Sequence, residues 1–534
     1  MIKIILFSLY LYNSVSFSYA NLIVENGVIW TVDKKMPMAQ AMVIEDNKIT
    51  YVGDALGAQK FSNPDSQRID LKGRLVLPAF IDCHVHFSGG GLLFSRINLL
   101  DVKSAEQFSE EIKKYVHSMK KEEWVLGGRW DHERWKVRQL PNKKLIDEFT
   151  KNNPLLLSRT DGHMAIANSL ALKLAKIDKN TPNPQGGFIQ KDENGELTGI
   201  LVDSAISLVA KQIPALDIES RKKAILKSIE HFHENGTLGI QDMSTSLDDI
   251  KAYEELLNEK KLNIRIASYP LIELWEKIYN TSTQDKNIFK VVGVKGYSDG
   301  SLGATSALFF DSYADAPESK GISLLPGLEE NIKNSFHKNL QIAIHAIGDK
   351  ANDEVLKIFH NLNKSRKSDL KYPFRIEHVQ HLREEEILEF SQENVIASMQ
   401  PWHLIDDSNF AEKRLGKERL KFTYAFRSLL DAKSIVVFGS DWPVAPMNPL
   451  HGIWAAVTNN WIPSQRIKVE EAIDAYTLSA AKASLDEDVK GSLEVGKLAD
   501  FIVLSENILT IPAEKIKDVK VDLTIFNGKM VRGN

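Results

Sequence analysis

The fold is decided by Leu75-Val-Leu-Pro-Ala-Phe-Ile-Asp-Cys-His-Val-His86, which Phe87-Ser-Gly-Gly-Gly91 follows. The apolar run predicts a buried β-strand that ends in two histidines separated by one residue. Because side chains alternate between the faces of a strand, His84 and His86 point to one side and Cys83 to the other. Two imidazoles on one face can chelate a metal ion, so this stretch predicts part of a metal site. The alternative is a strand that ends in two histidines with ordinary hydrogen-bond partners.

Length, charge and cysteine content limit the kinds of protein that this chain can be. The chain has 534 residues, of which 43% are hydrophobic, and a net charge of -4. This length predicts one large domain with a smaller one, and the near-neutral charge gives no reason to expect a nucleic-acid partner. The single cysteine excludes an internal disulfide framework and a metal site built from cysteines.

The first twenty residues have the pattern of a secretory signal. Lys3 supplies a positive start, Ile4 to Tyr12 form an apolar run, and Ser18-Tyr19-Ala20 is a small-x-small cleavage site. The alternative is a membrane anchor, but the apolar run is too short to span a bilayer. We therefore expect cleavage after Ala20 and a periplasmic or extracellular protein. No later stretch reads as a membrane span.

Both ends of the mature chain predict short β-strands. Residues 21–74 contain Asn26-Gly27 between two β-rich runs, and residues 490–534 contain Asn527-Gly528, each a hairpin signal. Neither end supplies enough strands for a core of its own. We expect the two ends to pair into one composite β-sandwich beside a central domain of residues 75–489.

The central domain alternates strands with helical stretches, which is typical of an α/β protein with parallel strands. Eight strands of this kind predict a closed (β/α)₈ barrel, as in TIM barrels. The gap between the first two strands is too long for one helix, so we predict an insertion at about residues 124–203. The predicted strands are Leu75–Asp82, Gly239–Asp242, Asn263–Tyr269, Val291–Tyr297, Gln341–His345, Arg375–His378, Val395–Met399 and Ile435–Gly439.

Polar residues stand at or just past the ends of several predicted strands: Lys295, His345, His378, Gln400 and Asp441. In a barrel of this type, chemistry takes place at the carboxyl ends of the strands. Together with the first two histidines, the set contains four histidines and one aspartate. These ligands suit a divalent transition metal, with zinc as the default.

Lys295 lies in an otherwise apolar strand. A cationic lysine facing a metal would be repelled and costly to desolvate. Burial lowers the pKa of a lysine, and its neutral amine can take up CO₂ to form a carbamate, an anionic ligand able to bridge two metals. The alternative is a lysine paired with a nearby carboxylate such as Asp299.

A second H-x-H pattern, His231-Phe-His233, lies in the helical stretch from Ile225 to Glu234. Positions two apart on a helix point to nearly opposite sides, so these two histidines are not expected to share a metal.

Taken in order, the motifs of this chain resemble those of the amidohydrolase superfamily, and specifically of its YtcJ-like branch. The best-known activity of that branch is N-substituted formamide deformylation. The matching stretches span the mature chain in family order. They are Ala79-Phe-Ile-Asp-Cys-His-Val-His86, Arg159-Thr-Asp-Gly-His163, Gly186-Gly-Phe-Ile189, Lys295-Gly-Tyr-Ser-Asp-Gly-Ser-Leu302, Ile344-His-Ala-Ile-Gly-Asp349, Arg375-Ile-Glu-His378, Gln400-Pro401, Gly439-Ser-Asp-Trp-Pro443 and Gly496-Lys-Leu-Ala-Asp500.

The resemblance implies a (β/α)₈ barrel with a composite β-sandwich, and a metal centre of one or two ions. It implies hydrolysis of a non-peptide carbon–nitrogen bond by metal-bound hydroxide, with Asp441 as general base and acid and His378 near the carbonyl. The implied metal ligands are His84, His86, His345, His378, Asp441 and a carboxylated Lys295.

A small-molecule substrate is expected. Trp130 and Trp402 are candidates for the walls of its pocket, with Asp131, His163 and His403 as polar contacts. The alternative is that the tryptophans pack in the interior and the histidines cap loops.

Two other functions fit parts of the sequence. The same centre could cleave an ester, lactone or phosphoester, or could catalyse deamination. A protein of another class, an exported metal- or solute-binding protein on a degenerate barrel, would have lost ligands. Here all six ligand positions are present and Asp441 is intact.

Overall fold

The computed structural model describes residues 21–159, 164–184, 187–280, 285–325, 327–365 and 372–533. The predicted signal sequence, residues 1–20, lies outside this part of the chain. The described residues form two compact units. One is made of those up to Val85, of His231–Ser244 and of those from Asn263 on, and the other of the described residues of His86–Glu230 and Thr245–Leu262. Within the ranges given above, no helix combines the length and apolar character that crossing a membrane requires.

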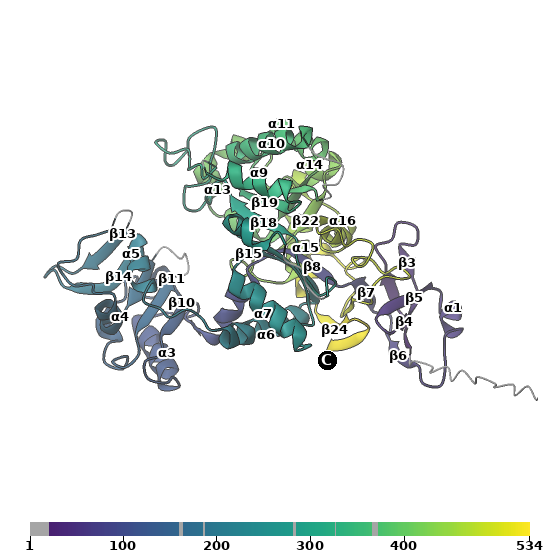
Figure 1. Ribbon diagram of the computed structural model, residues 1–534, viewed down its shortest axis with the longest axis horizontal. Coiled ribbons are helices and arrows are strands. Elements are labelled where there is room, and N and C mark those ends of the chain that lie inside the picture. The colour runs from purple at the N-terminus through teal and green to yellow at the C-terminus, as the bar shows by residue number, and fades with distance from the viewer. Residues whose placement is uncertain are drawn as a thin grey trace, which may run out of the picture. The chain divides into compact units, whose positions relative to one another are not determined.

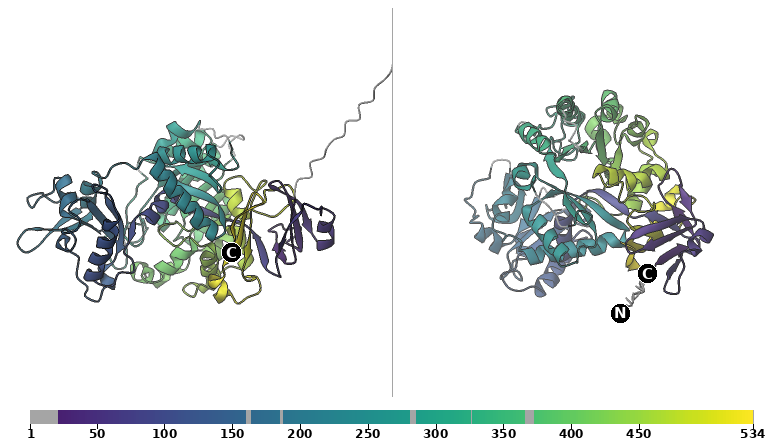
Figure 2. Two further views of the ribbon diagram at one scale, coloured as in Figure 1. Left: turned by 90° about the horizontal axis from the view of Figure 1, so that it is seen from below. Right: turned by 45° about the vertical axis from the view of Figure 1, so that its right-hand side comes forward.

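In the first unit, strands from both ends of the chain pair with one another. In Figure 2 the purple N-terminal strands lie beside the yellow C-terminal ones, and β23 pairs antiparallel with β7. A four-stranded sheet consists, in order, of β5 (Lys48–Gly53), β4 (Ala41–Glu45), β1 (Leu22–Glu25) and β6 (Gln67–Asp70). A six-stranded sheet consists, in order, of β25 (Lys529–Gly533), β24 (Val521–Phe526), β23 (Phe501–Leu504), β7 (Leu75–Pro78), β2 (Val28–Trp30) and β3 (Met38–Ala39).

One apolar core joins these two sheets. Val24 and Met42 of the four-stranded sheet belong to the same buried cluster as Val76 and Phe501 of the six-stranded sheet. Helix α1 (Ala55–Gln59) begins at Asp54, whose carboxylate accepts a hydrogen bond from the Gly57 amide, a common N-cap arrangement.

The two predicted hairpins have different outcomes. Asn527 and Gly528, with φ of 51° and 72°, form the two-residue turn between β24 and β25, as the sequence predicts. The hairpin predicted at Asn26-Gly27 is wrong, because β1 and β2 lie in different sheets. The glycine is needed there for close packing, since a Cβ on Gly27 would lie 2.5 Å from the Cβ of Leu71.

Two further sheets of the first unit are built from parallel strand pairs. Each strand of the second sheet is buried, in keeping with the near-continuous apolar runs of its sequence. The first sheet consists, in order, of β17 (Phe289–Val291), β16 (Arg265–Pro270), β15 (Thr237–Thr245) and β8 (Phe80–Val85). The second consists, in order, of β18 (Gly293–Tyr297), β19 (Gln341–Ala346), β20 (Phe374–His378), β21 (Val395–Met399) and β22 (Val436–Phe438).

These two parallel sheets are bridged at both ends. An isolated parallel bridge joins Val85, at the end of β8, to Trp442, just past β22. A second bridge joins Leu271, just past β16, to Lys295 on β18. The carboxyl ends of β8, β20 and β22 thereby lie on the same edge of the parallel strands.

The predicted first strand, Leu75–Asp82, is in fact two strands in two sheets. Leu75–Pro78 pairs with β2 and β23, whereas Phe80–Val85 pairs with β15. The pairing changes at Ala79, whose amide donates to the Asp500 carbonyl, and at Phe80, whose amide donates to the Gly236 carbonyl. The predicted boundary at residue 75 therefore divides the terminal sheet, which continues to Pro78.

Helices follow the strands along the chain, and α9, α10 and α11 lie outside β18 and β19 in Figure 1. Helix α10 is amphipathic, with Val355, Leu356 and Phe359 buried and charged residues on its other face. The helices of this part are α8 (Trp275–Ile278), α9 (Glu329–His337), α10 (Asp349–Lys364), α11 (Glu384–Gln392), α12 (Pro401–Asp407), α13 (Ala411–Leu415), α14 (Phe426–Asp431), α15 (Pro449–Thr458), α16 (Val469–Ala475) and α17 (Leu478–Ala483).

The second unit contains a six-stranded mixed sheet. Its strands are, in order, β13 (Gly187–Lys191), β14 (Leu197–Asp203), β12 (Met164–Ala167), β11 (Leu155–Arg159), β10 (Val125–Trp130) and β9 (Ile97–Asn98). Its helices are α2 (Phe87–Gly91), α3 (Ala105–His117), α4 (Ser169–Leu174), α5 (Ser204–Ala210) and α7 (Leu247–Asn258), and α6 (Ile218–Glu234) ends in the first unit.

This unit extends beyond the insertion predicted at residues 124–203. Strand β9 pairs with β10, and Phe108 and Ile112 of α3 share a buried core with Val125 and Leu155. Because the apolar stripe of α3 packs in this core, the segment before residue 124 folds with the sheet that follows it.

Candidate metal centre

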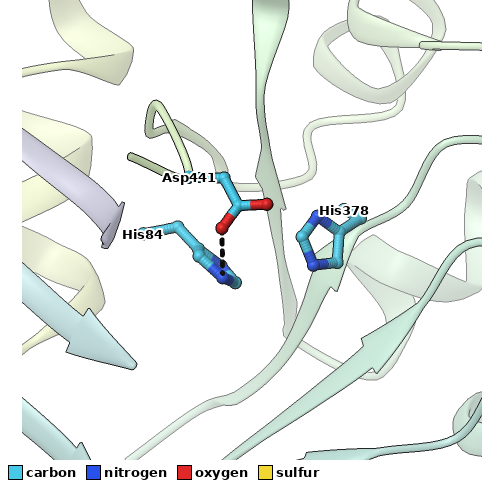
Figure 3. A group of neighbouring side chains, drawn as sticks. All are labelled: His84, His378 and Asp441. Carbon is cyan, nitrogen blue, oxygen red and sulfur yellow. Dashed lines mark ion pairs between the residues drawn. The ribbon is translucent and has the colours of Figure 1, made fainter. Parts of the chain in front are cut away.

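Three buried side chains converge at the carboxyl ends of the parallel strands. His84 comes from β8, His378 from the last residue of β20, and Asp441 from the loop after β22. One ligand atom from each lies within 4.8 Å of the others. Nε2 of His84 is 3.5 Å from Oδ1 of Asp441, and the two imidazole centroids are 4.7 Å apart. Figure 3 shows the carboxylate of Asp441 directed toward the two rings.

Short backbone contacts hold the ends of β8 and β22 together. The Asp441 amide donates to the His84 carbonyl at 2.7 Å. Asp82 accepts hydrogen bonds from the amide and hydroxyl of Ser440, at 2.9 and 2.6 Å, and from the His84 amide at 3.2 Å. His378 and Asp441 both have left-handed backbone, with φ of 77° and 59°, a conformation that few non-glycine residues adopt and that histidine and aspartate adopt more often than most.

Gly439 is required by this close approach. A Cβ added there would lie 2.5 Å from the His84 amide nitrogen and 2.9 Å from Oδ1 of Asp82. We expect Gly439→Ala to lower the free energy of unfolding by about 1–3 kcal/mol and to weaken metal binding. Denaturant unfolding and metal titration check this, with Gly303→Ala as control, because its Cβ would meet only Phe410 at 3.8 Å. Equal stability of the two variants would contradict the prediction.

The two imidazoles are oriented by partners behind them. Nδ1 of His84 lies 2.7 Å from Oε2 of Glu377, and Nδ1 of His378 lies 2.8 Å from Oε1 of Gln400. An oxygen acceptor at Nδ1 places the ring proton there, so Nε2 is the ring nitrogen that has the lone pair a metal binds. Burial would raise the pKa of Glu377, but Arg375 and then His84 lower that pKa to about 2, so Glu377 is a carboxylate.

His345, at the end of β19, lies beside this group. Its ring centroid is 4.5 Å from that of His378. Nε2 of His345 lies 3.2 Å from the Gly300 carbonyl oxygen and 3.4 Å from Oδ1 of Asp299. Donation from Nε2 to Gly300 leaves Nδ1 as the ring atom with a lone pair.

Lys295 is 1% exposed on β18. Within the described ranges its Nζ has no hydrogen-bond partner, and it lies 4.5 Å above the ring of Tyr297. Asp299 is not its partner: that carboxylate accepts the backbone amides of Leu308, Ile347 and Gly348 at 2.9–3.0 Å. Burial lowers the pKa of Lys295 to about 8, which gives the amine a neutral form near physiological pH.

The histidines of the cluster are neutral at pH 7. Burial, followed by the charge of Lys295, lowers the pKa of His84 to about 4 and that of His345 to about 3. Burial and the neighbouring His345 lower the pKa of His378 well below its ordinary value. Neutral imidazole is the form that binds metals, so the cluster is chemically suited to a divalent ion.

Other predicted residues lie in the second unit. His86 follows the last residue of β8 and precedes α2. Trp130 is fully buried in the core of that unit, where its Nε1 donates to the Leu157 carbonyl at 2.9 Å, in agreement with the packing alternative. Asp131 forms an ion pair with Arg159 at 2.9 Å. His163 lies outside the described residues.

The two residues predicted after β21 begin α12. Nε2 of His403 is 3.8 Å from Oδ2 of Asp441, and its ring stacks on His378 with 6.2 Å between centroids. His403 therefore adjoins the cluster. Trp402 is half-buried, and its ring packs 5.4 Å from that of His451.

The second H-x-H pattern behaves as an ordinary helical segment. Both histidines are on α6, where Nε2 of His233 lies 2.9 Å from the Asn263 carbonyl and the His231 ring packs against Trp442.

The sequence pattern alone assigns no role to three residues near the centre: Asp82, Arg375 and Glu377. The last two are charged residues two positions apart in a buried apolar strand, and that spacing puts both on one face. Charged side chains are almost never fully buried unless paired, which is the signal that could have identified them.

Comparison with known proteins places the chain in a family. The model of the amidohydrolase family matches residues 67–532. The protein LONG AFTER FAR-RED 3 of Arabidopsis thaliana is 37% identical over 96% of this chain and 91% of its own length. An amidohydrolase of Bacillus subtilis, YtcJ, is 29% identical over 95% and 98%, and an N-substituted formamide deformylase of Arthrobacter pascens is 23% identical over 95% and 97%.

A solved structure agrees with these matches. An uncharacterized metal-dependent hydrolase from Pyrococcus furiosus superposes with a TM-score of 0.80 and 29% identity, covering 92% of this chain and 100% of the other. The resemblance inferred from the ordered motifs is thus confirmed. The chain belongs to the amidohydrolase family and is a hydrolase that acts on carbon–nitrogen bonds other than peptide bonds.

Proposed function

We propose that this chain is an exported, zinc-dependent hydrolase that cleaves an amide- or formamide-like bond of a small molecule. The observation that carries the proposal is the convergence of His84, His378 and Asp441 in a chain of this family. The formamide activity named for the Arthrobacter relative favours an amide-type substrate. Export rests on the signal-like sequence of residues 1–20.

The proposed architecture is a closed (β/α)₈ barrel with a composite β-sandwich. Strands β8, β15, β16 and β18–β22 would form the barrel, and the bridges Val85–Trp442 and Leu271–Lys295 support its closure, because each joins one parallel sheet to the other. The terminal sheets, with their shared core, would form the sandwich.

The donor atoms fit a divalent ion. His84 and His378 would offer Nε2, which their partners Glu377 and Gln400 leave unprotonated, and Asp441 a carboxylate oxygen. His86, His345 and carboxylated Lys295 would complete a set for one or two ions. Nitrogen and oxygen donors of this kind are those that zinc takes in catalytic sites.

The roles of the protein residues follow from these positions. A bound divalent ion would lower the pKa of water from about 15.7 to about 7 and polarise a carbonyl group. Asp441 accepts the proton of the attacking water and returns it to the leaving nitrogen, which departs as a neutral amine. His403, 3.8 Å from Asp441, is better placed than His378 to orient the carbonyl, because both ring nitrogens of His378 already have partners in this scheme.

A substrate panel tests the proposal. Purified protein is analysed for metal content and assayed on N-substituted formamides, N-acyl amino acids, esters and lactones. We expect bound metal and turnover of at least one amide. Turnover of esters alone would replace the proposal by an esterase, and bound metal without any turnover would favour a binding protein.

Lys295 provides a separate prediction. With a pKa of about 8, about one molecule in ten has the neutral amine at pH 7, so reconstitution with metal at a constant concentration of dissolved CO₂ should accelerate from pH 6 to pH 9. In the reaction the neutral amine attacks CO₂: the Nζ–C bond forms, one C=O π bond of CO₂ breaks with its electron pair going to oxygen, and the nitrogen releases a proton to solvent. Lys295→Ala should reduce activity by more than the roughly 100-fold that is typical when a hydrogen-bond partner of a metal ligand is lost, and a small carboxylic acid should restore part of it.

The matched control for that variant is Lys290→Ala, which removes another largely buried lysine, paired with Asp486 and not with the centre. Full metal content and activity in Lys295→Ala would show that this lysine is not a ligand.

A further inference from the structure

Arg375 is completely buried inside the first unit, and all five of its N–H groups have acceptors. The acceptors belong to five different strands, β20, β15, β16, β8 and β21. Nε donates to Oε1 of Glu377 at 2.8 Å, one terminal nitrogen donates to Oε1 of Gln241 and at 3.2 Å to the Tyr269 hydroxyl, and the other donates to the Cys83 carbonyl at 3.0 Å and the Ser398 hydroxyl at 3.1 Å.

This arrangement fixes one carboxylate. A guanidinium is planar and permanently charged, so five acceptors leave it a single position. Glu377 then has Oε1 on Arg375 and Oε2 2.7 Å from Nδ1 of His84, and both of its oxygens are engaged. The orientation of the His84 ring therefore depends on where Arg375 holds Glu377.

We propose that Arg375 is a positioning residue of the metal centre, acting on His84 through Glu377. The inference rests on the proposed function in one respect, that His84 binds the metal. Without Arg375, the Glu377 carboxylate would be buried without a counter-charge and would take up a proton or turn away. Nδ1 of His84 would lose its anionic acceptor, and the tautomer with the proton on Nδ1 would lose the stabilisation that Glu377 gives it.

A purely structural role must be separated from this one, because a buried arginine that ties five strands also stabilises the fold. Arg265 provides the comparison. It is 2% exposed in the same unit, pairs with Asp500 through two nitrogens and donates to Asn527, and none of these partners touches the centre. Its loss should lower stability and leave metal affinity unchanged.

The experiment measures Co²⁺ affinity by chelator competition, and the Co²⁺ absorption spectrum, on full-length protein shown to be folded by circular dichroism. The variants are Arg375→Met, Arg375→Lys, Glu377→Gln, the Arg375→Met/Glu377→Gln double variant, and Arg265→Met. We expect affinity about 10- to 100-fold weaker in Arg375→Met and in Glu377→Gln, with an altered spectrum. The double variant should bind no more weakly than Glu377→Gln, because both changes interrupt one path.

Additive losses in the double variant, or wild-type affinity in folded Arg375→Met, would overturn the inference. If Arg375→Met does not fold, Arg375→Lys decides: it keeps the charge but not the five-donor fork, and unchanged affinity would overturn the inference. If His84→Ala bound Co²⁺ as tightly as wild type, the proposed centre itself would be refuted. If His84→Ala weakened Co²⁺ binding but the Arg375 variants did not, only the role of Arg375 would be refuted.

Discussion

Asp441→Asn is expected to lower kcat by about 10²- to 10⁴-fold while the protein still binds metal. The Asp441 carboxylate lies between His84 and His403, with Oδ1 3.5 Å from Nε2 of His84 and Oδ2 3.8 Å from Nε2 of His403. An asparagine fills the same volume and can still offer one oxygen to a metal. It cannot accept and return a proton, so the chemical step should suffer more than binding. Steady-state kinetics on the best substrate of the panel, with metal content measured on the same samples, checks this.

Asp353→Asn is the matched control for that variant. Asp353 is also a buried aspartate of the first unit, but it lies on α10 and pairs with Lys357 and Arg383. Its kcat and metal content should stay near those of wild type. If Asp441→Asn turned over substrate at a near-normal rate with metal bound, the assignment of Asp441 as general base would be wrong.

The positions of His345, His378 and Asp441 could be predicted because they follow from local pattern. Each stands where a buried apolar run ends, and parallel strands bring such ends to one edge of the sheet. The end of each apolar run, read along one strand at a time, is enough to identify them, and the two-residue period of a strand adds the orientation of neighbouring side chains. That period also separates His84 from Cys83.

The hydrogen bonds that orient these residues could not be predicted, because they join partners far apart in the chain. The contact between Asp82 and Ser440 joins positions 358 residues apart, and that between His84 and Glu377 joins positions 293 apart. Such pairs depend on the order and stagger of the strands, which a single sequence does not contain. The same limit explains why Leu75–Asp82 was read as one strand: the change of partner at Ala79 is set by the neighbours Asp500 and Gly236.

The second unit shows the limit for local patterns as well. Strand β9 has only two residues, too few for any periodicity. The apolar stripe of α3 predicts that one face is buried, but it does not say against which sheet. Trp130 illustrates the same point. The sequence does not distinguish a tryptophan packed in the interior from one that lines a substrate pocket, and in the structure Trp130 packs in the core of its own unit.

Removal of the metal is expected to have the largest effect of all. Chelator treatment should reduce turnover to background, because water would return to a pKa about nine units higher. It should also lower the melting temperature, since an ion held at 100 times its Kd stabilises the folded state by about 2.7 kcal/mol. Zinc should restore both properties in wild type but in neither His84→Ala nor His378→Ala.

The control for those two variants is His233→Ala, which removes an equally buried histidine whose Nε2 faces the Asn263 carbonyl instead of the cluster. It should lose stability, because a packed ring is removed, and yet regain full turnover with zinc. Measuring the melting temperature with and without zinc separates the two roles. Loss of a structural histidine lowers the melting temperature but keeps the increase that zinc produces, whereas loss of a metal ligand also abolishes that increase. A chelated wild-type protein that kept its activity and its melting temperature would show that His84, His378 and Asp441 do not act through a metal.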